Sequence, residues 1–254
     1  VLIVAAIPEG LPVVATVALA RGMKQMADEN ALVRRLTAVQ TLGSTNVIFT
    51  DKTGTLTENQ MTMTEFREAG NVISISGEGL VTKGSFYSDD TELDPSKDPV
   101  LVEALKTGML CTNASIKEDE EGQTQGIGDP MEVALIVAGT KAGIDRNQLL
   151  EKMPEGKEIA FDPANKMMAT YNNTDNNRYR VSVKGAPESV LEVCTTINRN
   201  GEIEEMSGDE RSRWLDLNTE MASDGLRVLA MAVKATDTID EDPYSGLTFL
   251  GLSG

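Results

Sequence analysis

The sequence predicts an α/β protein with a short first part, which carries one reactive carboxylate, and a larger second part of mixed helices and strands. Residues 47–49 form a β-branched and aromatic run that is typical of a buried strand. The run ends at Asp51, and Gly54 allows a tight turn just after it. After residue 58, segments with helical spacing and segments with alternating spacing follow each other.

The charge of the chain changes at about residue 58. The 254 residues have a formal net charge of -17. Residues 1–57 carry five basic and four acidic side chains, whereas residues 58–254 carry 18 basic and 36 acidic side chains. This acidity argues against nucleic-acid binding, which needs a basic face, and disfavours docking on an anionic membrane surface. We interpret the charge as a well-solvated surface and expect no nucleic-acid partner.

Histidine and cysteine usage excludes several catalytic classes. The chain has no His, and Cys111 and Cys194 are its only cysteines. A Cys/His zinc site and a Ser-His or Cys-His catalytic pair are therefore excluded. Two unrelated thiols fit a reducing cytosol. The chain begins inside an apolar run without a recognisable signal peptide, and we expect both of its ends to be internal to a longer protein.

The first element is an apolar run over residues 1–20, interrupted by Pro8, Glu9, Gly10 and Pro12. Two prolines and a glycine make a poor soluble helix. In a membrane, a broken helix frees backbone carbonyls that can line an ion site, and a lone ionisable residue there is a functional candidate. A kinked apolar helix in a soluble core is the alternative interpretation.

Asp51 has the surroundings of a phosphoryl acceptor. At the end of a strand in an open α/β sheet, it would lie where such sheets bind their ligands. A carboxylate there can attack a phosphoryl group and form an aspartyl phosphate. Lys52 and the hydroxyls of Thr53 and Thr55 can offset the charge that develops. The alternative is an Asp that merely ends a strand and caps a turn.

The seven residues Asp51-Lys52-Thr53-Gly54-Thr55-Leu56-Thr57 resemble the phosphorylation motif of P-type cation-transporting ATPases. The resemblance implies a partial Rossmann-like, haloacid dehalogenase-like phosphorylation domain with Asp51, Lys52 and Thr53 as catalytic residues. It also implies Mg²⁺ held by Asp51 and the Thr53 carbonyl. Many members of that superfamily carry a second Asp where this chain has Thr53, so the resemblance implies a phosphoenzyme that is not quickly hydrolysed.

The run Val4-Ala5-Ala6-Ile7-Pro8-Glu9-Gly10-Leu11-Pro12 resembles the fourth transmembrane helix of type II pumps, the calcium and sodium/potassium branch. The resemblance implies a cation site made by the Glu9 carboxylate and the backbone carbonyls of Val4, Ala5 and Ile7. The transported ion can be Ca²⁺, Na⁺, K⁺ or H⁺, because the residues present do not distinguish these cations.

In the second part, strands and helices are predicted from spacing. Strands are expected over residues 61–66, 72–75, 180–184 and 225–232. Residues 247–252 resemble the family's last strand before the chain returns to the phosphorylation domain. Helices are expected over residues 100–111, 130–142 and 209–222, with a further helix opened by Pro187. Residues 78–99 and the acidic residues 117–125 are expected to be loops. The resemblance implies that these elements form an inserted α+β domain on an antiparallel sheet.

Glu132 is a candidate nucleotide ligand. Asp129 is expected to cap the helix over residues 130–142, with Pro130 at its first position. The start of the helix accounts for Asp129 and Pro130, but it gives no role to Glu132. In the resembling pumps the matching glutamate lies in the nucleotide pocket near the adenine amino group. Met131 departs from the Thr that the family commonly has.

The other nucleotide-binding candidates also follow from the resemblance. Phe161 matches an aromatic residue under the adenine base, and Lys166 a basic position near the nucleotide. Lys184 matches a lysine deep in the ATP pocket, where Gly185 lets a ligand approach the backbone. Arg227 matches an arginine on the ATP phosphates, a task that suits its planar fork of donors. The structural alternatives are a core Phe, an exposed turn Lys and an edge-strand Arg.

The resemblance implies an ATP-driven cation pump of the cell membrane, with ATP and Mg²⁺ as cofactors. Residues 1–27 would be the cytosolic part of a transmembrane helix and stalk, and residues 28–57 the first part of the phosphorylation domain. Residues 58–254 would be the nucleotide-binding domain and the start of the return to the phosphorylation domain. Arg21 and Lys24 would mark the membrane boundary, with residues from about Lys24 onward cytosolic.

Two expectations concern the chain on its own. The family's downstream motifs, a second Mg²⁺-binding Asp and a phosphate-contacting Lys, are absent from these 254 residues. We therefore expect the chain to bind adenine nucleotides weakly without turning over ATP. The alternatives to a pump are a soluble nucleotide-binding module, or a phosphatase-like member of the same superfamily without transport.

Overall fold

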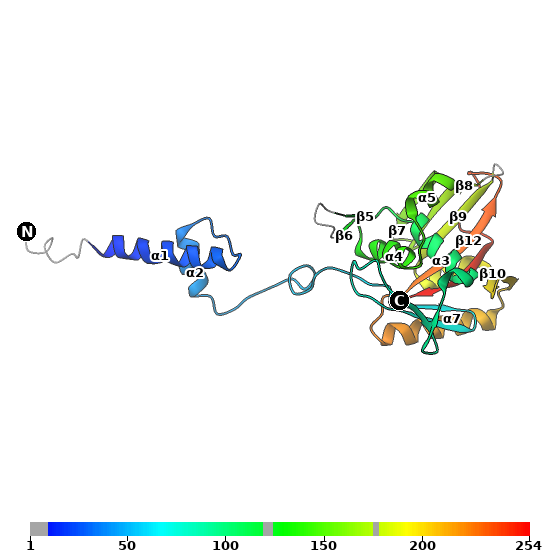
Figure 1. The fold of residues 1–254 in the computed structure, drawn as a ribbon, viewed down its shortest axis with the longest axis horizontal. Coiled ribbons are helices and arrows are strands. Elements are labelled where there is room, and N and C mark those ends of the chain that lie inside the picture. The colour runs from blue at the N-terminus through cyan, green and yellow to red at the C-terminus, as the bar shows by residue number, and fades with distance from the viewer. Residues whose placement is uncertain (1–9, 119–123, 175–177) are drawn as a thin grey trace, which may run out of the picture. The chain divides into compact units, whose positions relative to one another are not determined.

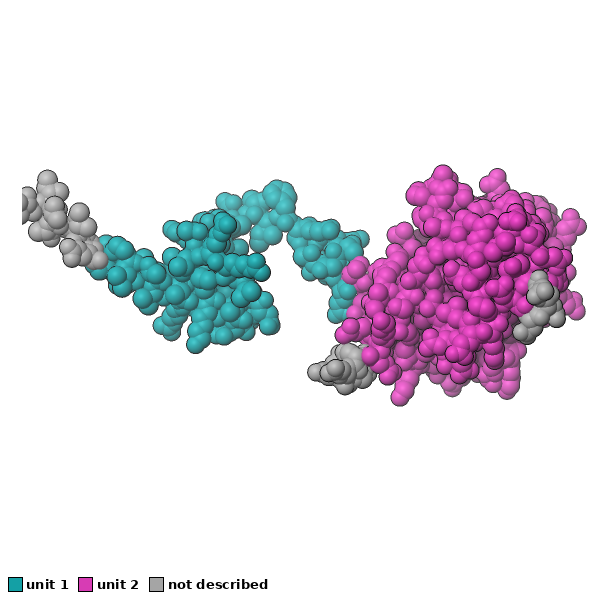
Figure 2. Space-filling view, turned by 90° about the horizontal axis from the view of Figure 1, so that it is seen from above, with its two compact units in different colours: residues 1–58 teal, residues 59–254 magenta. Residues whose placement is uncertain are grey.

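The computed structural model describes residues 10–118, 124–174 and 178–254. The chain divides into two compact units, Val1–Glu58 and Asn59–Gly254, which Figure 1 draws as ribbons and Figure 2 colours separately. The predicted cation ligands Val4, Ala5, Ile7 and Glu9 lie outside the described residues.

Unit 1 holds two helices, α1 (Leu11–Asp28) and α2 (Leu36–Gly43). Pro12 lies in the first turn of α1, where its missing N–H costs no intrahelical hydrogen bond. Neither helix has a buried residue. The membrane segment predicted over residues 1–20 is described only from residue 10 onward, and no helix among the described residues combines the length and the hydropathy needed to cross a bilayer.

The buried strand predicted over residues 47–49 is wrong in this structure. These residues form no strand, and the Phe49 side chain is 94% exposed. A strand needs a hydrogen-bonded neighbour, and every strand in the described part of the chain lies beyond residue 64. The local sequence pattern is that of a strand, but the described residues of unit 1 offer it no sheet, so the predicted Rossmann-like sheet is not seen there.

Unit 2 is built on a mainly antiparallel sheet, which confirms the predicted sheet type. The strand path is β4-β3-β2-β1-β13-β12-β9-β8-β7, and β10 joins β13 in parallel and β11 in antiparallel. The described strands of this sheet are β1 (Glu65–Glu68), β2 (Asn71–Ile75), β3 (Phe86–Ser88), β4 (Thr91–Leu93), β7 (Glu155–Asp162), β8 (Met167–Asn173), β9 (Tyr179–Gly185), β10 (Cys194–Arg199), β11 (Glu202–Glu205), β12 (Leu229–Thr236) and β13 (Leu247–Ser253). A separate hairpin pairs β5 (Ser115–Glu118) with β6 (Thr124–Ile127).

Helices cover both faces of this sheet. Met231 of β12 packs in a core cluster with α3 (Pro99–Leu110) and α4 (Pro130–Lys141). Its neighbours Ala230 and Ala232 pack in a second cluster with α6 (Pro187–Val193) and α7 (Gly208–Ser223). Because successive strand residues point to opposite faces, the two helix pairs lie on opposite sides of the sheet. The short helices η2 (Pro95–Lys97) and α5 (Arg146–Lys152) complete the unit.

Several element predictions are confirmed and others are wrong. The helices predicted over residues 100–111, 130–142 and 209–222 are α3, α4 and α7, and the strands predicted over 72–75, 180–184 and 247–252 are β2, β9 and β13. The predicted loop over residues 78–99 instead contains the β3–β4 hairpin. Its turn residues Asp89 and Asp90 both have positive φ, as a two-residue hairpin turn requires. The strand predicted over residues 61–66 begins only at Glu65, and the strand predicted over residues 225–232 begins only at Leu229.

The first and last strands of unit 2 are neighbours. Phe66 of β1 lies opposite Ser253 of β13. The backbone N–H of Thr64 donates to the Gly254 carbonyl at 2.9 Å, and the N–H of Gly254 donates to the Glu65 carbonyl at 2.9 Å. The last strand of the unit therefore lies inside the sheet, between β1 and β12.

Glu68 of β1 is a buried acid beside a second acid. Among the described residues, no donor reaches its Oε2 atom. Asp98, whose side chain caps α3 by accepting the N–H groups of Val100 and Leu101, lies next to it. Burial, the charge of Asp98 and a hydrogen bond to Asp98 together raise the pKa of Glu68 to about 7, against a weaker opposing hydrogen bond from Asn71.

We expect this raised pKa to make unit 2 less stable as the pH rises. The folded state keeps a proton on Glu68 that the unfolded chain, with a pKa of 4.5, has already released, so stability falls between about pH 4.5 and about pH 7 and levels off above. Glu68→Gln, which is neutral at all pH values, should lose this part of the pH dependence. Urea unfolding at pH 5 and pH 8 measures it, with Glu92→Gln on the exposed part of β4 as the charge-matched control. An unchanged pH profile in Glu68→Gln would contradict the assignment.

Candidate functional site

Lys184 and Glu132 form an ion pair at the centre of unit 2. Lys184 Nζ donates to Glu132 Oε1 at 2.6 Å, and the two side chains are 8% and 15% exposed. Lys184 lies on β9, between Met168 of β8 and Met231 of β12. Glu132 lies in the first turn of α4, which begins where predicted because Asp129 accepts the Met131 N–H at 2.9 Å.

The second carboxylate oxygen of Glu132 holds a loop. Its Oε2 atom accepts the backbone N–H of Asn113 at 2.9 Å and of Ala114 at 3.1 Å. Burial opposes the charged form, but the hydrogen bond and charge of Lys184, with the Asn113 N–H, hold the pKa of Glu132 below its usual value. Glu132 is therefore a fixed carboxylate with a donor on each oxygen.

Three residues that the sequence did not single out extend this network. Arg146 of α5 donates from Nε to the Met109 carbonyl at 2.9 Å and from Nη2 to the Thr112 carbonyl at 3.2 Å. Asn113 Nδ2 donates to Glu158 Oε1 of β7 at 2.9 Å. The bonded residues are 34 to 45 positions apart in the chain, so no local sequence signal marks them.

Phe161 and Lys166 lie at the end of β7 and in the turn after it. The Phe161 side chain is 58% exposed, so its ring is open to a ligand. The pairing of β7 with β8 is irregular between Ile159 and Asp162, and such bulges often re-aim side chains at functional sites. Lys166 has a positive φ of 56°, and its Nζ donates to Glu188 Oε1 at 2.9 Å on the surface.

Gly185 and Arg227 are the remaining candidates near the ion pair. A Cβ at Gly185 would lie well under 3.0 Å from the Lys166 carbonyl. Glycine at this position therefore allows the backbone of the β7–β8 turn to pack closely against it. The Ala186 N–H donates to the same carbonyl at 3.0 Å. Arg227 is exposed just before β12 and lines a cavity of about 190 Å³ together with Met131, next to Glu132 in α4.

The Asp51 segment belongs to unit 1 and is exposed. The Lys52 N–H donates to Asp51 Oδ1 at 2.7 Å, and the Leu56 N–H donates to the Lys52 carbonyl at 3.0 Å. Gly54 has a positive φ of 73°, which confirms the predicted tight turn. In the described ranges, no group of three or more His, Cys, Asp or Glu residues could hold a metal ion. Asp51 and the Thr53 carbonyl do offer oxygen ligands, which Mg²⁺ prefers. So small a number of protein ligands is usual where substrate phosphates supply the remaining ligands.

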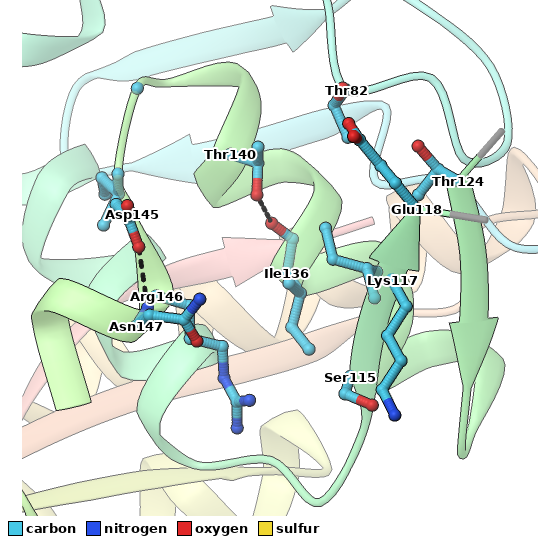
Figure 3. Close-up of a pocket in the computed structure, with 13 residues that line it drawn as sticks. Thr82, Ser115, Lys117, Glu118, Thr124, Ile136, Thr140, Asp145, Arg146 and Asn147 are labelled. Atoms are coloured by element: carbon cyan, nitrogen blue, oxygen red, sulfur yellow. Dashed lines mark hydrogen bonds between the residues drawn. The ribbon is translucent and has the colours of Figure 1, made fainter. Parts of the chain in front are cut away.

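A larger cavity of about 720 Å³ lies between the β5–β6 hairpin and helices α4 and α5, and Arg146 of the site network is among the residues that line it (Figure 3). Figure 3 shows polar and apolar side chains in its lining, with Thr140 donating to the Ile136 carbonyl and Asp145 accepting the Asn147 N–H. None of the predicted site residues lines it. The ion pair and its network therefore define the candidate site better than the size of a cavity does.

Comparison with known proteins identifies a family. A family model described as P-type ATPase, cytoplasmic domain N, matches residues 100–254, which include Glu132, Phe161, Lys184 and Arg227.

Three relatives match along the whole chain. The cation-transporting ATPase pma1 of Synechocystis is 41% identical over 100% of this chain and 28% of its own length. The calcium-transporting ATPase of Bacillus subtilis is 37% identical over 100% of this chain and 29% of its own length. The calcium-transporting ATPase type 2C member 1 of Mus musculus is 36% identical over 100% of this chain and 26% of its own length. This chain thus spans less than a third of these relatives. Because the family model covers more than half of the chain, the family predicted from the Asp51 motif is confirmed, and the chain belongs to the P-type ATPases.

Proposed function

We propose that this chain supplies the nucleotide-binding and phosphoryl-accepting parts of an ATP-driven cation pump. The observation that carries the proposal is the buried Lys184–Glu132 pair. An ammonium group held by a single carboxylate oxygen keeps donors for an incoming nucleotide. An exposed aromatic ring on β7 and an exposed arginine before β12 are available to a nucleotide on the same unit.

Each candidate residue has a role in this proposal. The Phe161 ring stacks on adenine, with Glu132 in the pocket near the base, and stacking of this kind is worth about 1–3 kcal/mol. Lys184, bonded to Glu132, lies in the same part of the pocket as that carboxylate, and Arg227 binds phosphate oxygens through its planar fork. Lys166 exchanges its exposed partner Glu188 for the nucleotide. Gly185 keeps the backbone beside Lys184 open.

Asp51 is the proposed phosphoryl acceptor, with Lys52 and Thr53 beside it. Its carboxylate attacks the γ-phosphorus of ATP, the bond to the β-phosphate oxygen breaks, and ADP leaves. Bound Mg²⁺ would be held by Asp51 and the Thr53 carbonyl, and it would neutralise phosphate charge. The exposed turn at Lys52 leaves the Asp51 carboxylate open to such a reaction. In the longer protein we propose that this step drives a cation past Glu9, with Ca²⁺, Na⁺, K⁺ and H⁺ as the candidate ions.

Calorimetric titration of the chain with ATP tests the nucleotide part, and labelling of the longer protein tests the transfer. We expect one saturable ATP site in the chain and no sustained phosphate release. In the longer protein, ATP labelled at the γ-phosphate should leave acid-stable label that Asp51→Asn abolishes. A chain that binds no ATP would remove the nucleotide role, and label that survives in Asp51→Asn would remove the acceptor role. Rapid loss of the label would favour a phosphatase-like enzyme.

A further inference from the structure

Asn113 connects the two halves of the candidate site. Lys184 Nζ contacts Glu132 Oε1 at 2.6 Å, and Glu132 Oε2 accepts the Asn113 N–H at 2.9 Å. The Asn113 side chain then donates to Glu158 Oε1 at 2.9 Å. Glu158 lies on β7, three residues before Phe161. We propose that Asn113 is a positioning residue that fixes the strand bearing Phe161 relative to Lys184, an inference that rests on the proposed nucleotide function.

The loop that carries Asn113 is held from both sides. Arg146 binds the carbonyl oxygens of Met109 and Thr112 on one side of it. Glu132 binds the N–H groups of Asn113 and Ala114 on the other. Thr112 and Ala114 are buried, whereas Asn113 is exposed. Because the backbone of this loop is fixed, the exposed Asn113 side chain can hold a bonded partner in one position.

Strand β7 depends on a contact of this kind because it lies at the end of the sheet. Among the strands of the described residues, β7 pairs with β8 alone, and this pairing is irregular near both ends of β7. The first half of β7 is also held by Lys157, which donates to the Ile239 carbonyl at 3.0 Å. Toward Phe161, β7 is joined to a residue outside the β7–β8 hairpin by the hydrogen bond between Asn113 and Glu158. An edge strand with one free side is more mobile than an interior strand.

In this arrangement the Asn113 side chain acts on the strand that carries Phe161, and so on recognition of the base. Loss of the Asn113 side chain would loosen β7 and Phe161, but it would leave the backbone N–H that binds Glu132. Lys184 would therefore keep its partner and its position. Affinity for the adenine end of ATP should fall, whereas affinity for a ligand without a base should not.

The test compares ATP with inorganic tripolyphosphate in calorimetric titrations of the chain. For Asn113→Ala we expect ATP affinity to fall about three- to tenfold, as for loss of one positioning hydrogen bond, and tripolyphosphate affinity to stay within about twofold. Amide hydrogen exchange in residues 158–162 of the free protein should become faster. Glu158→Ala should behave like Asn113→Ala, and the double variant should lose no more than either.

Matched variants make the result decisive. Glu158→Gln keeps an oxygen acceptor and should bind ATP like the unaltered chain, as should Glu155→Ala on the same strand. The proposal is overturned if Asn113→Ala leaves ATP affinity and hydrogen exchange unchanged, or if it weakens both ligands equally. If the unaltered chain binds no ATP, the proposed function fails first, and unchanged hydrogen exchange in Asn113→Ala would still count separately against the positioning role.

Discussion

Lys184→Met is expected to weaken ATP binding by about ten- to 100-fold, because it removes charged hydrogen bonds worth about 1.5–3 kcal/mol. It should also destabilise unit 2 by about 2 kcal/mol, since Glu132 is only 15% exposed and would lose the cation that its charge depends on. The ATP affinity from calorimetry and the free energy of unfolding from urea titration measure the two effects separately.

A double variant distinguishes the two roles of Lys184. Lys184→Met with Glu132→Gln removes the buried charge together with its partner, and the Gln side-chain oxygen can still accept the N–H groups of Asn113 and Ala114. We expect most of the lost stability to return while ATP affinity stays low. Recovery of ATP affinity in the double variant would show that Lys184 acts only through Glu132 and not on the nucleotide itself.

Gly251→Ala is expected to have the largest effect on stability, a loss of about 3 kcal/mol or more. Gly251 has a φ of +152°, and a Cβ there would lie well under 3.0 Å from the Arg67 carbonyl and the Phe66 ring. Both obstacles belong to β1, and Phe66 is fully buried, so neither can move aside. The urea midpoint of unit 2 should fall sharply.

Gly208→Ala is the matched control for this substitution. Gly208 opens α7, and a Cβ there would meet no atom within 4 Å. Alanine favours a helix more than glycine does, so the control should be neutral or stabilising by up to about 1 kcal/mol. If Gly251→Ala changed stability as little as Gly208→Ala does, β13 would have to shift far more freely than a packed interior strand can.

Locally encoded elements could be predicted from the sequence. Helix α4 begins where Asp129 and Pro130 indicate, because a cap and a helix-compatible φ act within one turn. The β10–β11 hairpin also has a local signal, since Asn200-Gly201 is the preferred pair for a two-residue turn, and both residues have positive φ. The β3–β4 hairpin has a weaker local signal, because its turn consists of Asp89 and Asp90 and the surrounding residues have a composition that is typical of loops.

Features that depend on distant partners could not be predicted in this way. Residues 47–49 have the composition of a strand, but a strand forms only beside another strand. The Lys184–Glu132 pair joins residues 52 positions apart, and the Asn113–Glu158 bond joins residues 45 positions apart. The family resemblance indicated Lys184 and Glu132 as candidate nucleotide ligands, but it did not indicate that they contact each other. It did not indicate Asn113, because its role arises from the position of the loop against β7.

The interior position of β13 has a consequence for the order in which unit 2 can fold. Strands β1 to β4 lie on one side of β13, and β12, β9, β8 and β7 lie on the other. A ribosome makes β13 after the other strands found among the described residues of the unit, so both halves of the sheet leave the ribosome before the strand that joins them. Until then, each half exposes the edge that β13 will cover, and such unpaired edges are where nascent chains aggregate. Cooperative folding of the whole sheet is therefore delayed until synthesis has passed residue 253, which makes this unit dependent on its last strand more than on its first.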